Sequence, residues 1–511
     1  MHVTRSRLGA KPLANAGIAA LGAGAGLPSY DRSSLVPAIV HFGVGGFHRA
    51  HQAVYLDDLA HDGDGWGVVG VGLRSDRMKR ALRPQDCLYT VLERDAHEDR
   101  ARVVGSISRY LYGPDDPEAV LSALSDPRTR MVTLTVTGDG YCFDHAAGEL
   151  DLGDPDLSHD LRQPRDPRTV VGYLVEGLRR RRAAGLAPFT VVSCDNVPSN
   201  GAVTRSAVVS LAEMRDPSLA RWIDAEAAFP ATVVDRITPQ TTPDVRRLLA
   251  DEFGIRDRWP VVAEPFAQWI VEDSFSNGRP PLEHAGVQFV GDVAQYELVK
   301  KRLLNGSHCA IGYLGYLAGL RTTDAAMRDP VLSRYAEALM EQELTALVPE
   351  MPGLDLADYK RTLLERFANP KIADPLQRLC GRGSTKMPAY LLPSLAEALE
   401  RGLPHERLTL AVAAWFLYMR GVDLDGEAIE VVDPRRTTLQ PLARRGDPRA
   451  LLAERSVFGE LGRDEAFVRE LETAMRVLEH VGAARAMQAL EHGEPAPGFG
   501  ARAGAGALAP A

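Results

Sequence analysis

Short apolar runs that end in glycine or a polar residue alternate with helix-like segments through the first half of the chain. Four of these runs, at 38–42, 66–73, 131–136 and 189–193, have the length and continuous apolar character of strands buried on both faces of a sheet. A helix-like segment at 48–59 follows the first run. This alternation favours an α/β fold with a doubly wound parallel sheet, in which the strand carboxyl ends line one crevice.

The sequence pattern changes near residue 285. From Tyr296 onward helical patterns dominate, and Asp329-Pro330 has the form of an N-cap followed by proline at the first helical position. The segments with helical patterning are 331–347, 355–367, 393–401, 408–419 and 465–478. Since 511 residues exceed one compact core, we predict a first domain with an N-terminal extension at 1–285, a mostly α-helical domain at 286–492 and a disordered tail at 493–511.

A glycine-rich turn, Gly43-Val44-Gly45-Gly46, directly follows the first predicted strand. Glycines in this place let the backbone approach a pyrophosphate at a helix N-terminus, although His48 stands where the usual fingerprint has its third glycine. Asp76, after the second strand, suits the ribose hydroxyls of NAD, whereas Arg74 could accept the extra phosphate of NADP. We therefore predict a Rossmann-like first domain that binds NAD, with NADP as the alternative. The expected cofactor contacts are Gly43, Val44, Gly45, Gly46, Phe47, Arg49 and Asp76.

The segment 300–308, KKRLLNGSH, combines residue types suited to moving the proton of an alcohol. On an α-helix with about 100° per residue, Lys300, Asn305 and His308 share one broad face, together with Glu297. A desolvated lysine can act as a base without a metal, and an asparagine amide can stabilise an alkoxide. Spacing alone does not choose between Lys300 and Lys301, and an amphipathic helix with solvated lysines has the same pattern.

Composition narrows the function classes. Residues 179–182 form one short basic run in a chain of net charge −9, so we expect no nucleic-acid partner. The longest apolar run, 309–320, is shorter than the roughly 20 residues of a membrane span. The five cysteines are scattered without CxxC spacing, which indicates neither a zinc site nor a disulfide framework and fits the cytoplasm. No heptad seam that would indicate a coiled-coil dimer is visible, and we expect a monomer, although the sequence does not fix the oligomeric state.

The motif Lys-x4-Asn-x2-His at 300–308 resembles the signature of the polyol-specific long-chain dehydrogenase (mannitol dehydrogenase) family, and its spacing selects Lys300. His48 in place of the third glycine is normal in that family. The resemblance runs from about residue 28 to about residue 490. Its segments include IVHFGVGGFHRAHQA at 39–53, LYTVLERD at 88–95, LTVTGDGY at 134–141, SCDNVPSNG at 193–201, DRITPQT at 235–241 and RFANP at 366–370.

The resemblance implies an NAD-dependent oxidoreductase that interconverts D-mannitol and D-fructose by metal-independent hydride transfer. Lys300 would be the catalytic base, or the acid in ketone reduction. The other implied roles are Asn196 and Asn305 on the substrate oxygen, His308 on an adjacent hydroxyl, Asp235 in orienting the lysine or substrate, Glu297 in proton passage to water, and Arg378 and Lys386 along the substrate.

Other readings remain open. Within the family, D-arabinitol 4-dehydrogenase and the fructuronate or tagaturonate reductases are alternatives, and a uronate would need a further cation such as Arg382. Residues 137–140, TGDG, depart from the Thr-Glu-Lys-Gly common in the family, which bears on the cofactor contacts. Outside enzymes, the alternative is a nucleotide-binding sensor that has lost catalysis.

Overall fold

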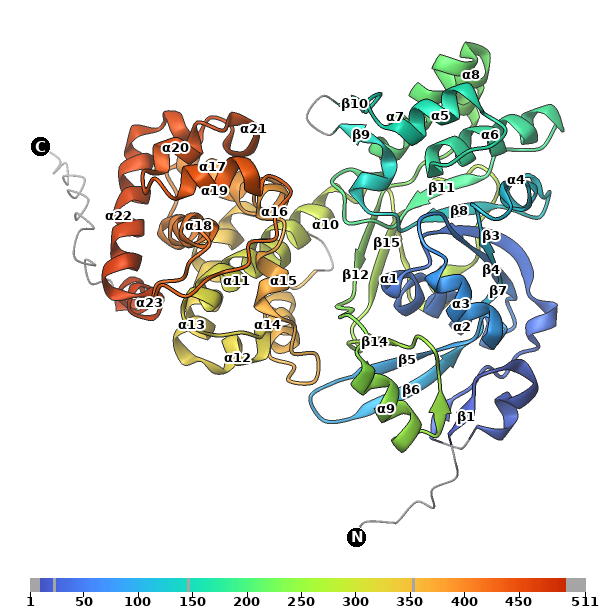
Figure 1. Cartoon of the computed structure of the whole chain (residues 1–511), viewed down its shortest axis with the longest axis horizontal. Coiled ribbons are helices and arrows are strands. Elements are labelled where there is room, and N and C mark those ends of the chain that lie inside the picture. The colour runs from blue at the N-terminus through green and yellow to red at the C-terminus, as the bar shows by residue number, and fades with distance from the viewer. Residues whose placement is uncertain (1–9, 22–23, 145–147, 352–353, 493–511) are drawn as a thin grey trace, which may run out of the picture. The chain divides into compact units, whose positions relative to one another are not determined.

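The structure is a computed structural model that describes residues 10–21, 24–144, 148–351 and 354–492. The chain forms two compact units, one up to Ala294 and one from Gln295 (Figure 1). The first unit extends past the predicted boundary near residue 285 because β16 (Gln288–Val290) pairs in parallel with β15 (Gln268–Glu272). The predicted tail at 493–511 lies outside the described residues.

The first unit is built on a five-stranded parallel sheet with the order β11-β8-β3-β4-β7. Its strands are β3 (Val36–Phe42), β4 (Trp66–Gly72), β7 (Ile107–Tyr112), β8 (Met131–Leu134) and β11 (Thr190–Ser193). Four of them are the strands that the apolar runs predict, and β7 is added at one edge. The prediction of a parallel α/β sheet is confirmed.

Side chains of each strand alternate between two cores, one on each face of this sheet. Val40 and Phe42 pack with residues of α4 (Pro117–Ser125), α6 (Val170–Ala183) and α7 (Asn200–Arg215). Ile39 and Val68 pack on the other face with residues of α2 (Gln52–His61). Helices therefore cover both faces, as in a doubly wound sheet.

The helix expected at 48–59 is interrupted. The chain forms α1 (Gly46–Ala50) and α2 (Gln52–His61), and between them His51 has φ −127° and ψ −91°, outside the helical region. The His51 ring bonds through Nε2 to the carbonyl of Gln268 at 2.8 Å. The periodic pattern runs through this position, so the break depends on a contact with a distant strand.

Smaller sheets complete the first unit, and the sequence did not predict them. One has the order β14-β5-β6-β2 and another the order β12-β15-β16. Their further strands are β2 (Ala25–Gly26), β5 (Tyr89–Arg94), β6 (Asp99–Val104), β12 (Thr232–Asp235) and β14 (Val261–Ala263). Two short pairs are β1 (Lys11–Pro12) with β13 (Ile255–Arg256), and β9 (Phe143–Asp144) with β10 (Glu149–Leu150). The remaining α-helices are α3 (Arg77–Leu82), α5 (Pro155–Arg162), α8 (Pro217–Glu226) and α9 (Pro243–Glu252).

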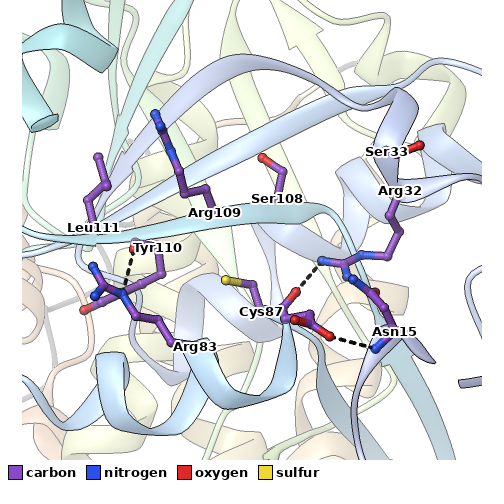
Figure 2. Close-up of a pocket in the computed structure, with 10 residues that line it drawn as sticks. Asn15, Arg32, Ser33, Arg83, Cys87, Ser108, Arg109, Tyr110 and Leu111 are labelled. Atoms are coloured by element: carbon purple, nitrogen blue, oxygen red, sulfur yellow. Dashed lines mark hydrogen bonds between the residues drawn. The ribbon is translucent and has the colours of Figure 1, made fainter. Parts of the chain in front are cut away.

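A pocket of about 570 Å³ lies along β7, the edge strand of the parallel sheet (Figure 2). Arg32 donates from Nη2 to the carbonyl of Ile107 at 2.8 Å, and Arg83 donates from Nε to that of Tyr110 at 3.4 Å. The Arg109 side chain extends away from both guanidiniums in Figure 2. The two arginines therefore cover outward carbonyls of an exposed strand edge, which protects it from pairing with another chain.

The described residues of the second unit form helices and connecting loops, with two isolated β-bridges, Thr322 with Pro375 and Val422 with Ala428. Its core surrounds α11 (Ser307–Leu317) and α18 (Glu406–Met419), which are buried over most of their length. The other α-helices are α10 (Ala294–Val299), α12 (Thr323–Arg328), α13 (Pro330–Ala338), α14 (Leu356–Phe367), α15 (Leu376–Cys380), α16 (Gly383–Tyr390), α17 (Leu392–Arg401), α19 (Arg436–Ala443), α20 (Pro448–Leu452), α21 (Arg455–Phe458), α22 (Glu465–Val481) and α23 (Ala483–His492).

The predicted helix starts and periods are largely confirmed here. Oδ1 of Asp329 accepts hydrogen bonds from the backbone N–H groups of Val331 and Leu332 at 2.9 and 3.0 Å, as an N-cap does. The long helix expected at 331–347 is α only as far as Ala338, and it continues as a π-helix at Leu339–Leu344 and a 3-10 turn at Thr345–Leu347. In the described part of the chain, no helix is long and apolar enough to cross a membrane.

Candidate functional site

The glycine turn follows β3 and lies against the end of β8. Gly43 has φ +93°, and a Cβ added there would lie 2.1 Å from the carbonyl oxygen of Thr135. The Thr135 hydroxyl donates to the Gly43 carbonyl at 2.7 Å, and the Gly43 N–H donates to Val71 at 2.9 Å. Both the left-handed backbone and the close approach of β8 therefore require glycine at this position.

The residues after Gly43 form an open turn that fits a dinucleotide phosphate. Gly45 is exposed and is the N-cap of α1, while Gly46 and Phe47 are partly exposed. Val44 is buried in the core. The turn thus brings an exposed glycine to a helix start after a parallel strand, which is the position of the pyrophosphate in Rossmann folds.

Arg49, also predicted at the cofactor, lies beneath this turn and is only 1% exposed. Its Nε donates to the Gly45 carbonyl at 3.2 Å, and its Nη1 donates to the Trp259 carbonyl. The guanidinium also lies over the ring of Tyr89, 5.4 Å from the centroid. In the structure Arg49 supports the turn from within the core, and its direct contact with a cofactor stays a prediction.

Two stacked histidine rings fill the space below the turn. The rings of His41 and His48 lie 3.3 Å apart between centroids and 12° from parallel. The His41 nitrogens bond to the hydroxyls of Thr133 and Thr135 at 2.7 and 2.9 Å. Burial lowers the pKa of His41 to about 3 and that of His48 well below its usual value. Both rings are therefore neutral at physiological pH, and His48 takes up the space that a third glycine would leave open.

The acidic residue expected for the ribose lies after β4, next to β3 in the sheet. Asp76 is partly exposed, immediately before α3, and its Oδ1 lies 3.0 Å from Nη2 of Arg80. Arg74 is exposed in the same loop. The two residues that sequence reasoning weighed for NAD and NADP thus stand in one loop at the carboxyl edge of the sheet.

Asn196 follows β11 and Asp235 ends β12, and a buried amide hydrogen-bonds to both of these segments. Asn196 is exposed just after β11, and Asp235 is the buried last residue of β12. Nδ2 of Asn200 donates to the carbonyls of Asp195 and Thr232 at 3.1 and 3.0 Å. The amide therefore joins the carboxyl end of β11 to the start of β12, the strand that ends at Asp235, although neither strand pairs directly with the other.

Asp195 is a residue at this edge that sequence reasoning missed. Its carboxylate accepts hydrogen bonds from the N–H groups of Val136 and Thr137, both at 2.9 Å, and from the hydroxyl of Tyr141 at 2.7 Å. The available signal was an acidic residue directly after a buried strand. Its partners come from another strand end, so the pairing is not readable from spacing.

The predicted catalytic segment is a π-helix between two α-helices. Lys300–Gly306 has π geometry, preceded by α10 and followed by α11. The expectation of a continuous α-helix, and the angles calculated from it, are therefore wrong. Because hydrogen bonds in a π-helix join residues five apart, Lys300 and Asn305 lie closer to one line than 3.6 residues per turn would place them. Single π turns are frequent at functional sites.

The three consecutive basic residues of this segment have different surroundings. Lys300 is buried, with 7% of its surface exposed. Nζ of Lys301 lies 2.6 Å from Oε1 of Glu297 in a partly exposed ion pair. Arg302 donates to the carbonyl of Leu347 and pairs with Glu397. Of the two candidate lysines, Lys300 has the desolvated environment that a metal-free base requires.

Two polar side chains that follow Lys300 in the chain, Asn305 and Ser307, are buried and have atoms that form no hydrogen bond within the described part of the chain. Asn305 is 8% exposed, and its Nδ2, like Oγ of Ser307, makes no hydrogen bond with any described residue. The His308 ring packs against Phe367 with centroids 4.2 Å apart. A buried amide without a partner is costly unless a ligand or water accepts its hydrogen bond, so the amide suits a ligand oxygen.

Arg378 and Lys386, predicted along the substrate, lie together in the second unit. Nε of Arg378 lies 2.6 Å from Oδ1 of Asp374, and Nζ of Lys386 donates to the carbonyls of Arg378 and Leu379, both at 3.0 Å. Burial lowers the pKa of Lys386. Arg378 therefore pairs with a residue just before α15, whereas Lys386 binds carbonyls near the end of this helix. Arg382 is the exposed N-cap of α16, with φ +61°.

The described residues contain no group of three or more histidine, cysteine, aspartate or glutamate side chains that could hold a metal ion. The five cysteines are all buried thiols.

The parallel sheet, the glycine turn after β3 and the acidic residue after β4 define a dinucleotide-binding domain of the Rossmann class. A model of the mannitol dehydrogenase Rossmann domain matches residues 37–284, and a model of the mannitol dehydrogenase C-terminal domain matches residues 292–479. The chain belongs to the mannitol dehydrogenase family.

Individual relatives are similar over almost the whole chain. A mannitol 2-dehydrogenase of Aspergillus fumigatus is 48% identical over 477 residues, which cover 91% of this chain and 95% of the relative. The Pseudomonas fluorescens mannitol 2-dehydrogenase, in a ternary complex with NAD and D-mannitol, is 42% identical with a TM-score of 0.88 over 94% of this chain and all of that one. A D-sorbitol dehydrogenase structure is 35% identical, with a TM-score of 0.86 over 93% of this chain and all of that one.

Proposed function

We propose that this protein is an NAD-dependent polyol dehydrogenase that interconverts D-mannitol and D-fructose. The observation that carries the proposal is the buried Lys300 on a π turn with the amide of Asn305, in a chain 48% identical to a mannitol 2-dehydrogenase. The glycine turn of the first unit fits the pyrophosphate of the cofactor, because the exposed Gly45 is the N-cap of a helix that follows a parallel strand.

Lys300 acts as the acid–base group in this proposal. NAD supplies the acceptor for the hydride that leaves the carbinol carbon. The lysine amine takes the hydroxyl proton as the carbonyl forms, and the ammonium returns it to the oxygen in ketose reduction. Only 7% of the Lys300 surface is exposed, so little bulk water competes for the proton that the amine accepts.

The amides and the histidine hold the substrate. Asn305 Nδ2 donates to the oxygen that becomes alkoxide-like, and Asn196 is the second amide that we assign to this oxygen. His308 binds an adjacent hydroxyl, and Asp235 orients the lysine or the substrate. Glu297 serves proton exchange with water, which its partly exposed pair with Lys301 allows.

The choice of polyol rests on the relatives' names, so the assay compares substrates directly. Purified protein is given NADH with D-fructose or D-fructuronate, and NAD with D-mannitol, D-sorbitol or D-arabinitol, and absorbance at the NADH band is followed. We expect D-fructose and D-mannitol to give the highest kcat/KM. Turnover confined to fructuronate would indicate that Arg382 binds a carboxylate and would overturn the proposal. An absence of turnover with every sugar and polyol would favour a nucleotide-binding sensor.

We further propose a monomer in a reducing compartment such as the cytoplasm. The five buried, free thiols support the compartment. Light scattering of the purified protein tests the oligomeric state, since a dimer would double the measured mass.

A further inference from the structure

We propose that Asp195 is a positioning residue for hydride transfer, because it joins the loop after β8 to the loop that carries Asn196. The inference rests on the proposed dehydrogenase function. It concerns a contact within the first unit, between the carboxyl ends of two adjacent parallel strands.

The Asp195 carboxylate is almost surrounded by donors. It is 8% exposed and accepts from the N–H groups of Val136 and Thr137 and from the Tyr141 hydroxyl. The Tyr141 oxygen also lies 2.5 Å from Oγ of Ser193. Three donors from the loop after β8 thus converge on one side chain that follows β11.

The loop that Asp195 holds has an unfavourable backbone. Thr137 has φ +65° and ψ 165°, which a β-branched residue rarely adopts. A Cβ added at Gly140 would lie 2.8 Å from Cβ of Val136, so the turn is also tight. Such a conformation persists only where surrounding contacts hold it, and the two backbone bonds to Asp195 act at its start.

The same loop is joined to the glycine turn. Thr135, directly before the held residues, donates from its hydroxyl to the Gly43 carbonyl at 2.7 Å. On the other side, Asn196 follows Asp195 in the chain, and the Asp195 carbonyl is held by Asn200. Asp195 therefore lies in a continuous set of bonds between the proposed pyrophosphate turn and a proposed substrate amide.

A carboxylate suits this position better than an amide. All three partners of Asp195 donate, and a carboxylate only accepts, whereas the NH2 of an asparagine would face one of the donors. Asp195→Asn keeps the size of the side chain and removes at least one bond to the loop. Shifts of the loop and of Asn196 then misalign the reacting groups, where displacements of about 1 Å can cost up to a hundredfold in rate.

The chain offers a matched control in Asp160. It is fully buried and accepts from the N–H groups of Arg168 and Thr169 and from the Thr169 hydroxyl, at 2.8, 2.9 and 2.6 Å. Its donors are thus of the same kinds as those of Asp195, but they lie between α5 and α6. Burial raises the pKa of both carboxyl groups. Asp160→Asn therefore reproduces the structural loss without touching the loop after β8.

The experiment measures kcat and KM for D-fructose, the Kd of NADH by fluorescence, and Tm for the full-length wild type, Asp195→Asn and Asp160→Asn. We expect similar losses of Tm, a kcat lowered about tenfold to a hundredfold only in Asp195→Asn, and an NADH Kd changed less than about threefold in both. Equal kcat values in the two variants would overturn the inference. A wild type without turnover would instead overturn the proposed function.

If Asp195→Asn has no cooperative unfolding transition and is therefore not folded, Tyr141→Phe tests the positioning role in its place. It removes one donor to Asp195 and leaves both backbone bonds. We expect kcat to fall by about threefold to tenfold with the NADH Kd unchanged. A kcat equal to that of the wild type in a folded Tyr141→Phe would contradict the positioning role.

Discussion

Nζ of Lys301 lies 2.6 Å from Oε1 of Glu297, one turn earlier in the chain, while the neighbouring Lys300 is buried. The two lysines are adjacent in sequence, yet Lys301 is partly exposed and Lys300 is buried. Lys301 thus lies in an ion pair near solvent, whereas the Lys300 side chain is withdrawn from it. This difference in exposure distinguishes Lys301 from Lys300, although helical spacing places both lysines on one broad face.

Lys300→Ala should lower kcat by about 10² to 10⁴, because the proton of the alcohol would have no positioned acceptor. NADH binding should change less than about threefold. Stopped-flow turnover and fluorescence titration measure the two quantities. Lys301→Ala is the control, and we expect it to retain most of its activity. A near-normal Lys300→Ala beside an inactive Lys301→Ala would show that the base is assigned to the wrong lysine.

Gly43→Ala should destabilise the first unit and impair NADH binding. The new Cβ would meet the Thr135 carbonyl, and the turn would have to move. Gly63→Ala is a matched control, since Gly63 has φ +100° and no atom within 4 Å of the added Cβ. We expect the control to cost about 1 kcal/mol for its backbone alone, and Gly43→Ala about 2 kcal/mol more.

Urea titration gives these free energies, and NADH fluorescence gives the binding. If the two alanine variants lose the same stability and bind NADH alike, the close approach of β8 does not determine the turn.

Asp76→Ala should shift the cofactor preference toward NADPH. Removal of the carboxylate takes away the acceptor for the ribose hydroxyls of NAD and the repulsion of a 2′-phosphate. We expect the ratio of kcat/KM for NADPH to that for NADH to rise about tenfold. Arg80→Ala removes the partner of Asp76 and keeps the carboxylate, so it should leave the preference for NADH in place. An unchanged ratio in Asp76→Ala would place the ribose contact elsewhere.

Because of His41, the free energy of unfolding should decrease as the pH is lowered from about 6.5 to about 3. Burial lowers the pKa of His41 from 6.5 to about 3, so in this window the unfolded chain binds a proton that the folded chain does not. Stability therefore rises with pH here and levels off above the upper limit. His41→Asn should flatten this dependence in urea titrations at a series of pH values. An equally steep dependence in the variant would assign it to other groups.

His405 should make stability decrease as pH rises, which is opposite to the effect of His41. Its hydrogen bond to Glu470, with Nε2 2.9 Å from Oε2, raises the pKa of the ring. The contribution is complete below the ordinary pKa of histidine and is lost as pH rises through the raised value. His405→Gln should therefore cost stability at pH 6 and little at pH 9. A constant cost across that range would mean that the pair does not titrate.

Much of the fold could be predicted because it depends on local patterns. The runs that became β3, β4, β8 and β11 are apolar enough for strands covered on both faces, and Asp329-Pro330 starts a helix through bonds to its own next residues. The edge strand β7 was missed because Ser108 and Arg109 interrupt its apolar residues. Two of its carbonyls are covered by Arg32 and Arg83, which come from elsewhere in the chain.

By itself the sequence determined the parallel sheet, the glycine turn at Gly43 and the Lys-x4-Asn-x2-His spacing, since these depend on residues close together in the chain. The tertiary structure decided the break between α1 and α2 at His51, the π turn at 300–306 and the hydrogen bonds that Asp195 accepts from the loop after β8. The helix break at His51 and the contacts of Asp195 depend on hydrogen bonds to residues tens to hundreds of positions away. The π turn begins and ends inside a sequence pattern that also fits an α-helix. Local periodicity carries no record of such long-range contacts.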